Sequence, residues 1–170
     1  MSSNWNNMEL DRKKIKIYPG FTMIELVLVM AIISILSVIF IPKFNDTLDE
    51  MRLLNCGDKI IDDLKLIYNQ AIVQHDSTWF VADTSANTYG IYAGSSSLTR
   101  TLILDPSTNK PQIVDIEDLF PGVSITNVDF GGSLEFMFDW WGTPSSGGII
   151  VLNDIDTIYV TAETGYIHND

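Results

Sequence analysis

The sequence predicts an α+β fold, in which one long N-terminal helix packs on a C-terminal antiparallel β-sheet domain. An apolar run near the N-terminus continues at helical spacing, and many short β-rich runs follow it. A length of 170 residues suits one domain with a core and an accessory segment. A hydrophobic content of 46% excludes a disordered or collagen-like chain.

Charge separates the first twenty residues from the rest. They contain two acidic residues and four basic ones, Arg12, Lys13, Lys14 and Lys16, although the whole chain has a net charge of −12. Basic residues that flank an apolar span stay in the cytoplasm, so the body of the protein is expected outside. The acidic body argues against nucleic acid as a partner, because that affinity comes largely from Lys and Arg.

Residues 21–41 form an apolar run of 21 residues. As a helix it would be about 32 Å long, enough to cross the hydrocarbon core of a bilayer. A cleaved secretory signal would be shorter and would end in a small-x-small site, which the sequence FIPKF at 40–44 lacks. We therefore predict a transmembrane and assembly helix over 21–41.

Glu25 is the only charged residue of that run. An acid at the centre of a span costs roughly 2.5–3.5 kcal/mol on insertion scales, and less near an end, so it needs a partner. A cut between Gly20 and Phe21 would create an α-amine at the membrane face. That amine could pair weakly with Glu25 in the same helix, or with Glu25 of a neighbouring staggered helix, where it would set the register.

The stretch GFTMIEL at 20–26, followed by the apolar run and IPKF at 41–44, resembles the class III signal of type IV prepilins and type II secretion pseudopilins. The resemblance implies that residues 1–20 are a leader, which prepilin peptidase removes after Gly20. It also implies that Phe21 becomes N-methylated and that Glu25 serves assembly. Whether the chain starts at Met1 or Met8 stays open.

Residues 42–76 are expected to continue the helix as an amphipathic segment. Pro42 should kink it, because proline lacks an N–H and clashes with the preceding turn. Apolar residues recur at helical spacing from Phe44 to Ala71, and acids such as Asp63 occupy other faces. Gly57 is a weak point that costs about 1 kcal/mol relative to Ala. Cys56 is the only cysteine, so we interpret it as a small apolar residue.

The β-rich head is expected over residues 77–170. A hairpin is predicted over 124–138, where Gly131 and Gly132 can form a tight turn. Ile125 and Val128 are out of phase in its first strand, which indicates a bulge. The predicted strands are 78–81, 89–92, 101–104, 112–116, 124–130, 134–138, 148–152, 157–160 and 166–168.

The head resembles the GspH/FimT class of minor pseudopilins and minor pilins. The resemblance depends on the order of the elements and on the short sequences FMFD at 136–139, GTP at 142–144 and GYI at 165–167. Trp140 and Trp141 could form a partner-binding patch. The alternative, which we favour at this point, is that one covers the end of the sheet and the other shields a turn.

Motifs of the common enzyme classes are absent from the sequence. There is no phosphate loop, no Gly-x-Ser-x-Gly elbow, no zinc-protease motif and no cysteine pair. His75 and His168 are expected as exposed surface histidines. Asp154 and Asp156 are weak Ca²⁺ candidates, but their loop lacks the Gly and Glu of an EF-hand, so a solvated turn is favoured. No cofactor is predicted, and the resemblance implies a peptidase substrate that is not itself an enzyme.

These observations predict a minor pilin-like subunit of a type II secretion pseudopilus or a type IV pilus, at or near the tip and initiating assembly. It would cross the bacterial inner membrane once, with a periplasmic head, before it joins the filament. Its partners would be prepilin peptidase, other pilins, the assembly platform and lipid. Two alternatives remain: an uncleaved anchored binding domain and a DNA-uptake pilin. The second alternative is weakened because, after Lys65, only Arg100 and Lys110 are basic.

Overall fold

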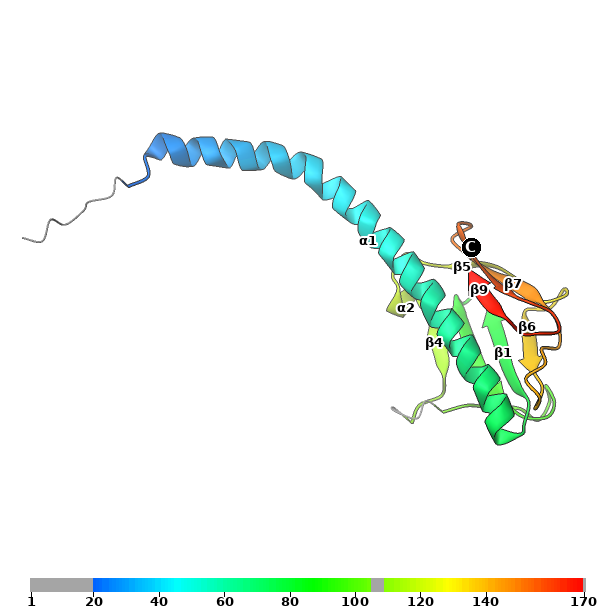
Figure 1. Cartoon of the computed structure of the whole chain (residues 1–170). Coiled ribbons are helices and arrows are strands. Elements are labelled where there is room, and N and C mark those ends of the chain that lie inside the picture. The colour runs from blue at the N-terminus through cyan, green and yellow to red at the C-terminus, as the bar shows by residue number, and fades with distance from the viewer. Residues whose placement is uncertain (1–19, 105–108, 170) are drawn as a thin grey trace, which may run out of the picture. The chain divides into compact units, whose positions relative to one another are not determined.

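The computed structural model describes residues 20–104 and 109–169, without the side chains of residues 39–46. The leader before Gly20, with its basic residues and both candidate start methionines, lies outside the described residues. The chain divides into two compact units, Met1–Pro42 and Lys43–Asp170, and we call the second unit the head. Helix α1 (Met23–Gln74) contributes to both units (Figure 1). Pro42 lies within α1, and the kink predicted there stays a prediction.

In the first unit, the start of α1 is apolar on all sides. Its large apolar side chains are exposed in the single chain, from Met23 to Val38, and so is Phe21 just before the helix. Among the described residues, no helix combines the length and the apolarity that crossing a membrane requires.

The head contains the predicted strands, and each predicted run overlaps one strand of the described residues. Helix α2 (Ile116–Leu119) follows the fourth strand. The strands are β1 (Thr78–Asp83), β2 (Thr88–Ala93), β3 (Thr101–Leu102), β4 (Ile113–Asp115), β5 (Ile125–Asp129), β6 (Glu135–Phe138), β7 (Gly148–Leu152), β8 (Asp156–Val160) and β9 (Ile167–Asn169).

The strands form two antiparallel sheets. The first sheet has the order β3-β2-β1-β6, with β4 also paired to β2, and the second has the order β5-β7-β8-β9. The α+β class with a helix on antiparallel strands is confirmed. The bulge is confirmed as well, as a register shift between Ile125 and Asn127 opposite β7.

The hairpin predicted over 124–138 is wrong, because β5 pairs with β7 while β6 pairs with β1. Gly131 and Gly132 do adopt positive φ angles of 68° and 89°, but their turn carries the chain from one sheet to the other. Phe130 and Phe136 on either side of this turn are both buried, and their rings stack with centroids 4.3 Å apart. Aromatic packing between the sheets thus replaces pairing between these two strands.

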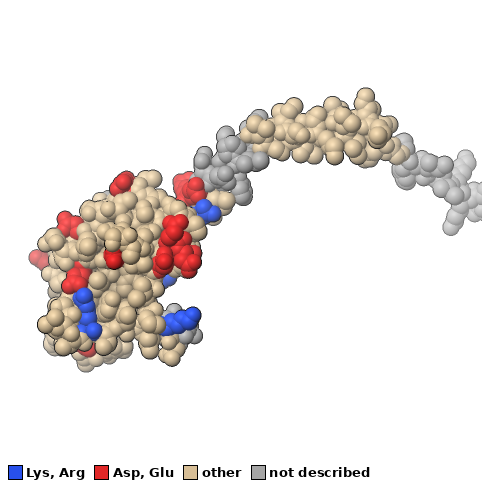
Figure 2. Space-filling view, turned by 180° about the vertical axis from the view of Figure 1, so that it is seen from behind, with Lys and Arg blue, Asp and Glu red and all other residues tan. Residues whose placement is uncertain are grey.

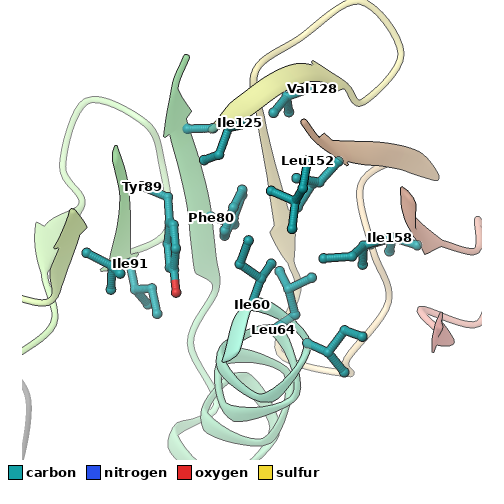
Figure 3. Close-up of a cluster of buried hydrophobic side chains, with 14 of the residues drawn as sticks. Ile60, Leu64, Phe80, Tyr89, Ile91, Ile125, Val128, Leu152 and Ile158 are labelled. Carbon is teal, nitrogen blue, oxygen red and sulfur yellow. The ribbon is translucent and has the colours of Figure 1, made fainter. Parts of the chain in front are cut away.

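The core lies where α1 meets both sheets. Ile60 and Leu64 of α1 are fully buried and point towards Phe80 of the first sheet and Leu152 of the second (Figure 3). Burial of each such side chain stabilises the fold by about 1.5–3 kcal/mol. Cys56 belongs to this cluster, which confirms its interpretation as a small apolar residue. Burial raises the pKa of its thiol to about 12, and the Asp156 carboxylate adds to the effect.

Asp63 departs from its predicted position on an outer face of the helix. Its side chain is buried, with only 6% of the residue exposed. Its Oδ2 accepts hydrogen bonds of 2.5 Å from the Tyr89 hydroxyl and of 2.5 Å from Lys59 Nζ. Burial raises the pKa of Tyr89, and the Asp63 carboxylate raises it further, so the phenol stays protonated and donates. The bond joins α1 to β2 of the first sheet.

Removing this hydroxyl should weaken the head. We expect Tyr89→Phe to lower the free energy of unfolding by about 1–3 kcal/mol, because a buried carboxylate loses one donor. Urea unfolding followed by tryptophan fluorescence measures the change. Tyr166→Phe is the matched control, since Tyr166 is exposed, and should stay within about 0.5 kcal/mol. Equal stability of both variants would contradict a stabilising role for the Asp63–Tyr89 bond.

Candidate functional site

The predicted assembly residues lie together at the start of α1. Gly20, Phe21, Thr22 and Glu25 line a shallow hollow of about 250 Å³. An added Cβ on Gly20 would meet no atom within 4 Å, so the described structure gives no packing reason for glycine there. A requirement for glycine at this position would have to come from a protein that acts on the segment.

Thr22 and Glu25 form a reciprocal capping box at the N-terminus of α1. The backbone N–H and the hydroxyl of Thr22 both donate to Glu25 Oε2, each at 2.9 Å. In return, the Glu25 backbone N–H donates to Thr22 Oγ1 at 3.3 Å. Thr-x-x-Glu before an apolar run is a known signature of a helix start. This signal was present in the sequence, but the sequence analysis considered only an α-amine as the partner of Glu25 and missed the capping box.

The capping box gives the Glu25 carboxylate two donors within its own chain. It also places the negative charge at the positive end of the helix dipole. Both donors are electrically neutral groups, however, so the net charge of the carboxylate is not cancelled. The structure thus brings Gly20, Phe21 and Glu25 together, and their roles in cleavage, methylation and assembly stay predictions.

Two serines in the apolar part of α1 are satisfied inside the helix. Ser34 Oγ donates to the Met30 carbonyl at 2.7 Å, and Ser37 Oγ donates to the Ile33 carbonyl at 2.8 Å. Such bonds to the preceding turn remove the need of a hydroxyl for water. The described side chains between Leu26 and Val38 therefore suit apolar surroundings.

The two weak Ca²⁺ candidates do not converge on one point. Asp154 is exposed at the turn between β7 and β8, whereas Asp156 is buried and faces α1. Asp156 Oδ2 has no hydrogen-bond partner and would lie 2.7 Å from a Cβ added to Gly57. No group of three His, Cys, Asp or Glu side chains within the described ranges could hold a metal ion. Glycine at position 57 thus leaves room for the Asp156 side chain. The sequence analysis, which considered only the helix propensity of Gly57, missed this reason for a glycine there.

The buried Asp156 carboxyl should make the stability of the head depend on pH. Burial raises its pKa above the ordinary value of 3.8, a hydrogen bond from the Thr157 backbone N–H offsets part of this rise, and the Asp58 charge adds a smaller increase. The folded state therefore holds this proton more tightly than the unfolded state, so stability falls as the pH rises above 3.8. We expect Asp156→Asn to gain stability relative to the wild type between about pH 4 and pH 7, measured by urea midpoints at each pH.

The exposed Asp154→Asn provides the control for this pH series. Its urea midpoints should change with pH in the same way as those of the wild type. If the urea midpoints of Asp156→Asn also follow those of the wild type at every pH, the prediction is wrong, because the Asp156 carboxyl then does not resist ionisation in the folded head.

The two histidines differ in their surroundings. His75 is exposed as predicted, and its ring meets Trp140 edge to face. His168 is half-buried, and its ring stacks on both Tyr159 and Tyr166, so its prediction as an exposed residue is wrong. The two tryptophans are both exposed. The favoured expectation, that one covers the end of the sheet and the other shields a turn, is therefore wrong.

The described head offers little to a nucleic acid. Arg100 is bound to Glu135 Oε2 at 2.7 Å, and its guanidinium lies over the rings of Trp79 and Tyr92. Figure 2 shows that acidic side chains outnumber basic ones on the face it presents. Arg100 is therefore part of the fold, and the DNA-uptake alternative loses one of its two basic residues.

The comparisons with known proteins agree with both resemblances. Residues 18–41 match the prokaryotic N-terminal methylation motif. The chain is similar in fold to two structures of the minor pseudopilin EpsH from the type II secretion system of Vibrio cholerae.

The two EpsH structures match with TM-scores of 0.55 and 0.54, both at 10% sequence identity. They cover 69% and 70% of this chain, and 94% and 95% of the EpsH chains. No curated protein sequence matches the chain. The resemblance seen in the sequence is confirmed for the motif at residues 18–41 and for the fold.

Proposed function

We propose that the chain is a minor pilin-like subunit of a type II secretion pseudopilus or a type IV pilus. One observation carries the proposal: the methylation motif at residues 18–41 opens an apolar helix that continues into a head with a pseudopilin fold. Prepilin peptidase would cut between Gly20 and Phe21, and Phe21 would then be N-methylated. EpsH is a minor pseudopilin, which supports a minor subunit. In our proposal this subunit lies at or near the tip and helps to start assembly.

Before assembly, residues 21–41 would anchor the protein in the bacterial inner membrane. The leader would stay in the cytoplasm and the head would lie in the periplasm. The large apolar side chains that the single chain exposes from Phe21 to Val38 support this location, because a helix that is apolar on all sides needs apolar surroundings. Lipid would surround them first, and the helices of other pilins would replace lipid when the assembly platform builds the filament.

Cleavage would change the surroundings of Glu25. The new amine of Phe21 would carry the full positive charge that the capping box lacks. Between parallel helices offset along their axes, the amine of one subunit would meet Glu25 of the next. Charge-assisted hydrogen bonds are about twice as strong as neutral ones, and stronger still in apolar surroundings. Only one stagger brings the two groups into contact, so the pairing would fix the register.

Gly20→Leu tests the cleavage site. We expect the leader to stay attached, because the peptidase would no longer accept the residue before the cut. Mass spectrometry of the membrane fraction should show a mature, methylated Phe21 N-terminus in the wild type and an intact leader in the variant. A mature-size Gly20→Leu protein would contradict the assigned site. An intact leader in the wild type would favour the uncleaved anchored domain.

Glu25→Ala and Glu25→Leu test the role in assembly. We expect both variants to be inserted and cleaved, but to enter filaments about tenfold less often, as a loss of about 1.4 kcal/mol per subunit contact would give. Immunoblots of sheared filaments against the membrane fraction measure the ratio. Glu50→Ala, an exposed acid in the second half of α1, is the control. Normal incorporation of both Glu25 variants would show that the pairing is not needed.

A further inference from the structure

The turn after β6 exposes two neighbouring tryptophans that the proposed function does not use. Trp140 is 48% exposed and Trp141 is 69% exposed. Their rings lie against each other, with centroids 4.3 Å apart and planes tilted by 36°. We call these two side chains the Trp pair. An exposed aromatic pair of this size marks an interaction surface, since tryptophan is enriched where partners bind.

The turn that carries the Trp pair is held rigidly. Asp139 Oδ1 accepts hydrogen bonds from the backbone N–H groups of Trp141 at 2.9 Å and Thr143 at 2.8 Å. The Asp139 N–H donates to the Thr143 carbonyl at 2.9 Å, which closes the turn. Gly142, with a φ of 83°, approaches α1 so closely that an added Cβ would lie 2.6 Å from the Tyr68 ring. A preformed surface of this kind loses little conformational entropy when a partner binds.

The surroundings of the Trp pair favour a cation. The ring of His75 meets Trp140 at a centroid distance of 6.3 Å, which places the end of α1 beside the pair. The last turn of α1 contains no basic residue, and Asp76 follows it. The negative end of the helix dipole is therefore not offset by a basic side chain of that turn. Tryptophan is also the best of the aromatic residues at binding Lys or Arg over its face.

We propose that the Trp pair docks a basic segment of another protein, with an arginine or lysine side chain seated over the indoles. A second copy of this chain fits poorly, because after Lys65 it offers only Arg100, which Glu135 and two rings already engage, and Lys110. The partner is thus expected to be a different protein with a positively charged surface, complementary to an acidic subunit with a net charge of −12. The docking does not depend on cleavage of the leader or on Glu25.

Peptide binding to the purified full chain in detergent tests this proposal. The probe is a fluorescent decapeptide of alternating arginine and serine, and its counterpart carries glutamate in place of arginine. We expect Trp140→Ala and Trp141→Ala each to weaken binding of the arginine peptide about fivefold or more, with a smaller loss for Trp141→Phe. Leu98→Ala removes another exposed apolar side chain, which is 95% exposed, and should stay within about twofold of the wild type.

Other results would overturn the proposal. One is equal binding of the arginine peptide to the wild type and the Trp variants, since the attraction would then come from net charge alone. Another is that a different ligand, either the glutamate peptide or a tetramer of N-acetylglucosamine, binds more tightly than the arginine peptide. A third is self-association of the wild type that the Trp variants lose, detected by light scattering. Thermal unfolding of each variant shows whether the head is folded, and Trp141→Phe preserves the test if an alanine variant unfolds.

Discussion

A carboxylate in an apolar helix needs a partner, and this constraint shapes the N-terminal part of the protein. Glu25 finds two donors in Thr22, so the helix starts at a defined residue. Because these donors are neutral, the cap stabilises the helix but leaves a negative charge that a cation can still bind. One residue can therefore define the start of a helix in the single chain and, in our proposal, define the contact between chains.

In the head, buried hydrogen bonds join α1 to the first sheet, where Thr78 Oγ1 donates to the Ile67 carbonyl at 2.8 Å, and a close steric fit joins α1 to the second. Asp63 binds Tyr89 of the first sheet, and Gly57 accommodates Asp156 of the second. The apolar residues between these contacts, such as Ile60, provide most of the stabilisation but little directional preference. The hydrogen bonds to the first sheet and the space that Gly57 leaves for Asp156 of the second therefore define how the helix lies on the sheets.

The sequence predicted the elements better than their pairing. Short strands such as β5 and β6 are visible from β-branched and aromatic residues, but the sheet in which each strand lies depends on contacts far along the chain. Gly131 and Gly132 allow a tight turn in either topology, so they could not reveal the change of sheet. Asp63 was misplaced because the pattern of acids suggested solvent, whereas its partner Tyr89 is 26 residues away. The motif around Glu25 was recognisable because its residues are consecutive.

The most direct test of the central claim is the structure of an assembled filament that contains this subunit. The measured quantity is the distance between the Glu25 carboxylate and the nearest cationic group. Our account predicts the α-amine of Phe21 from an adjoining subunit at hydrogen-bond distance, about 2.7–2.9 Å. A carboxylate that contacts only Thr22 of its own chain, with every amine beyond about 6 Å, would contradict the account.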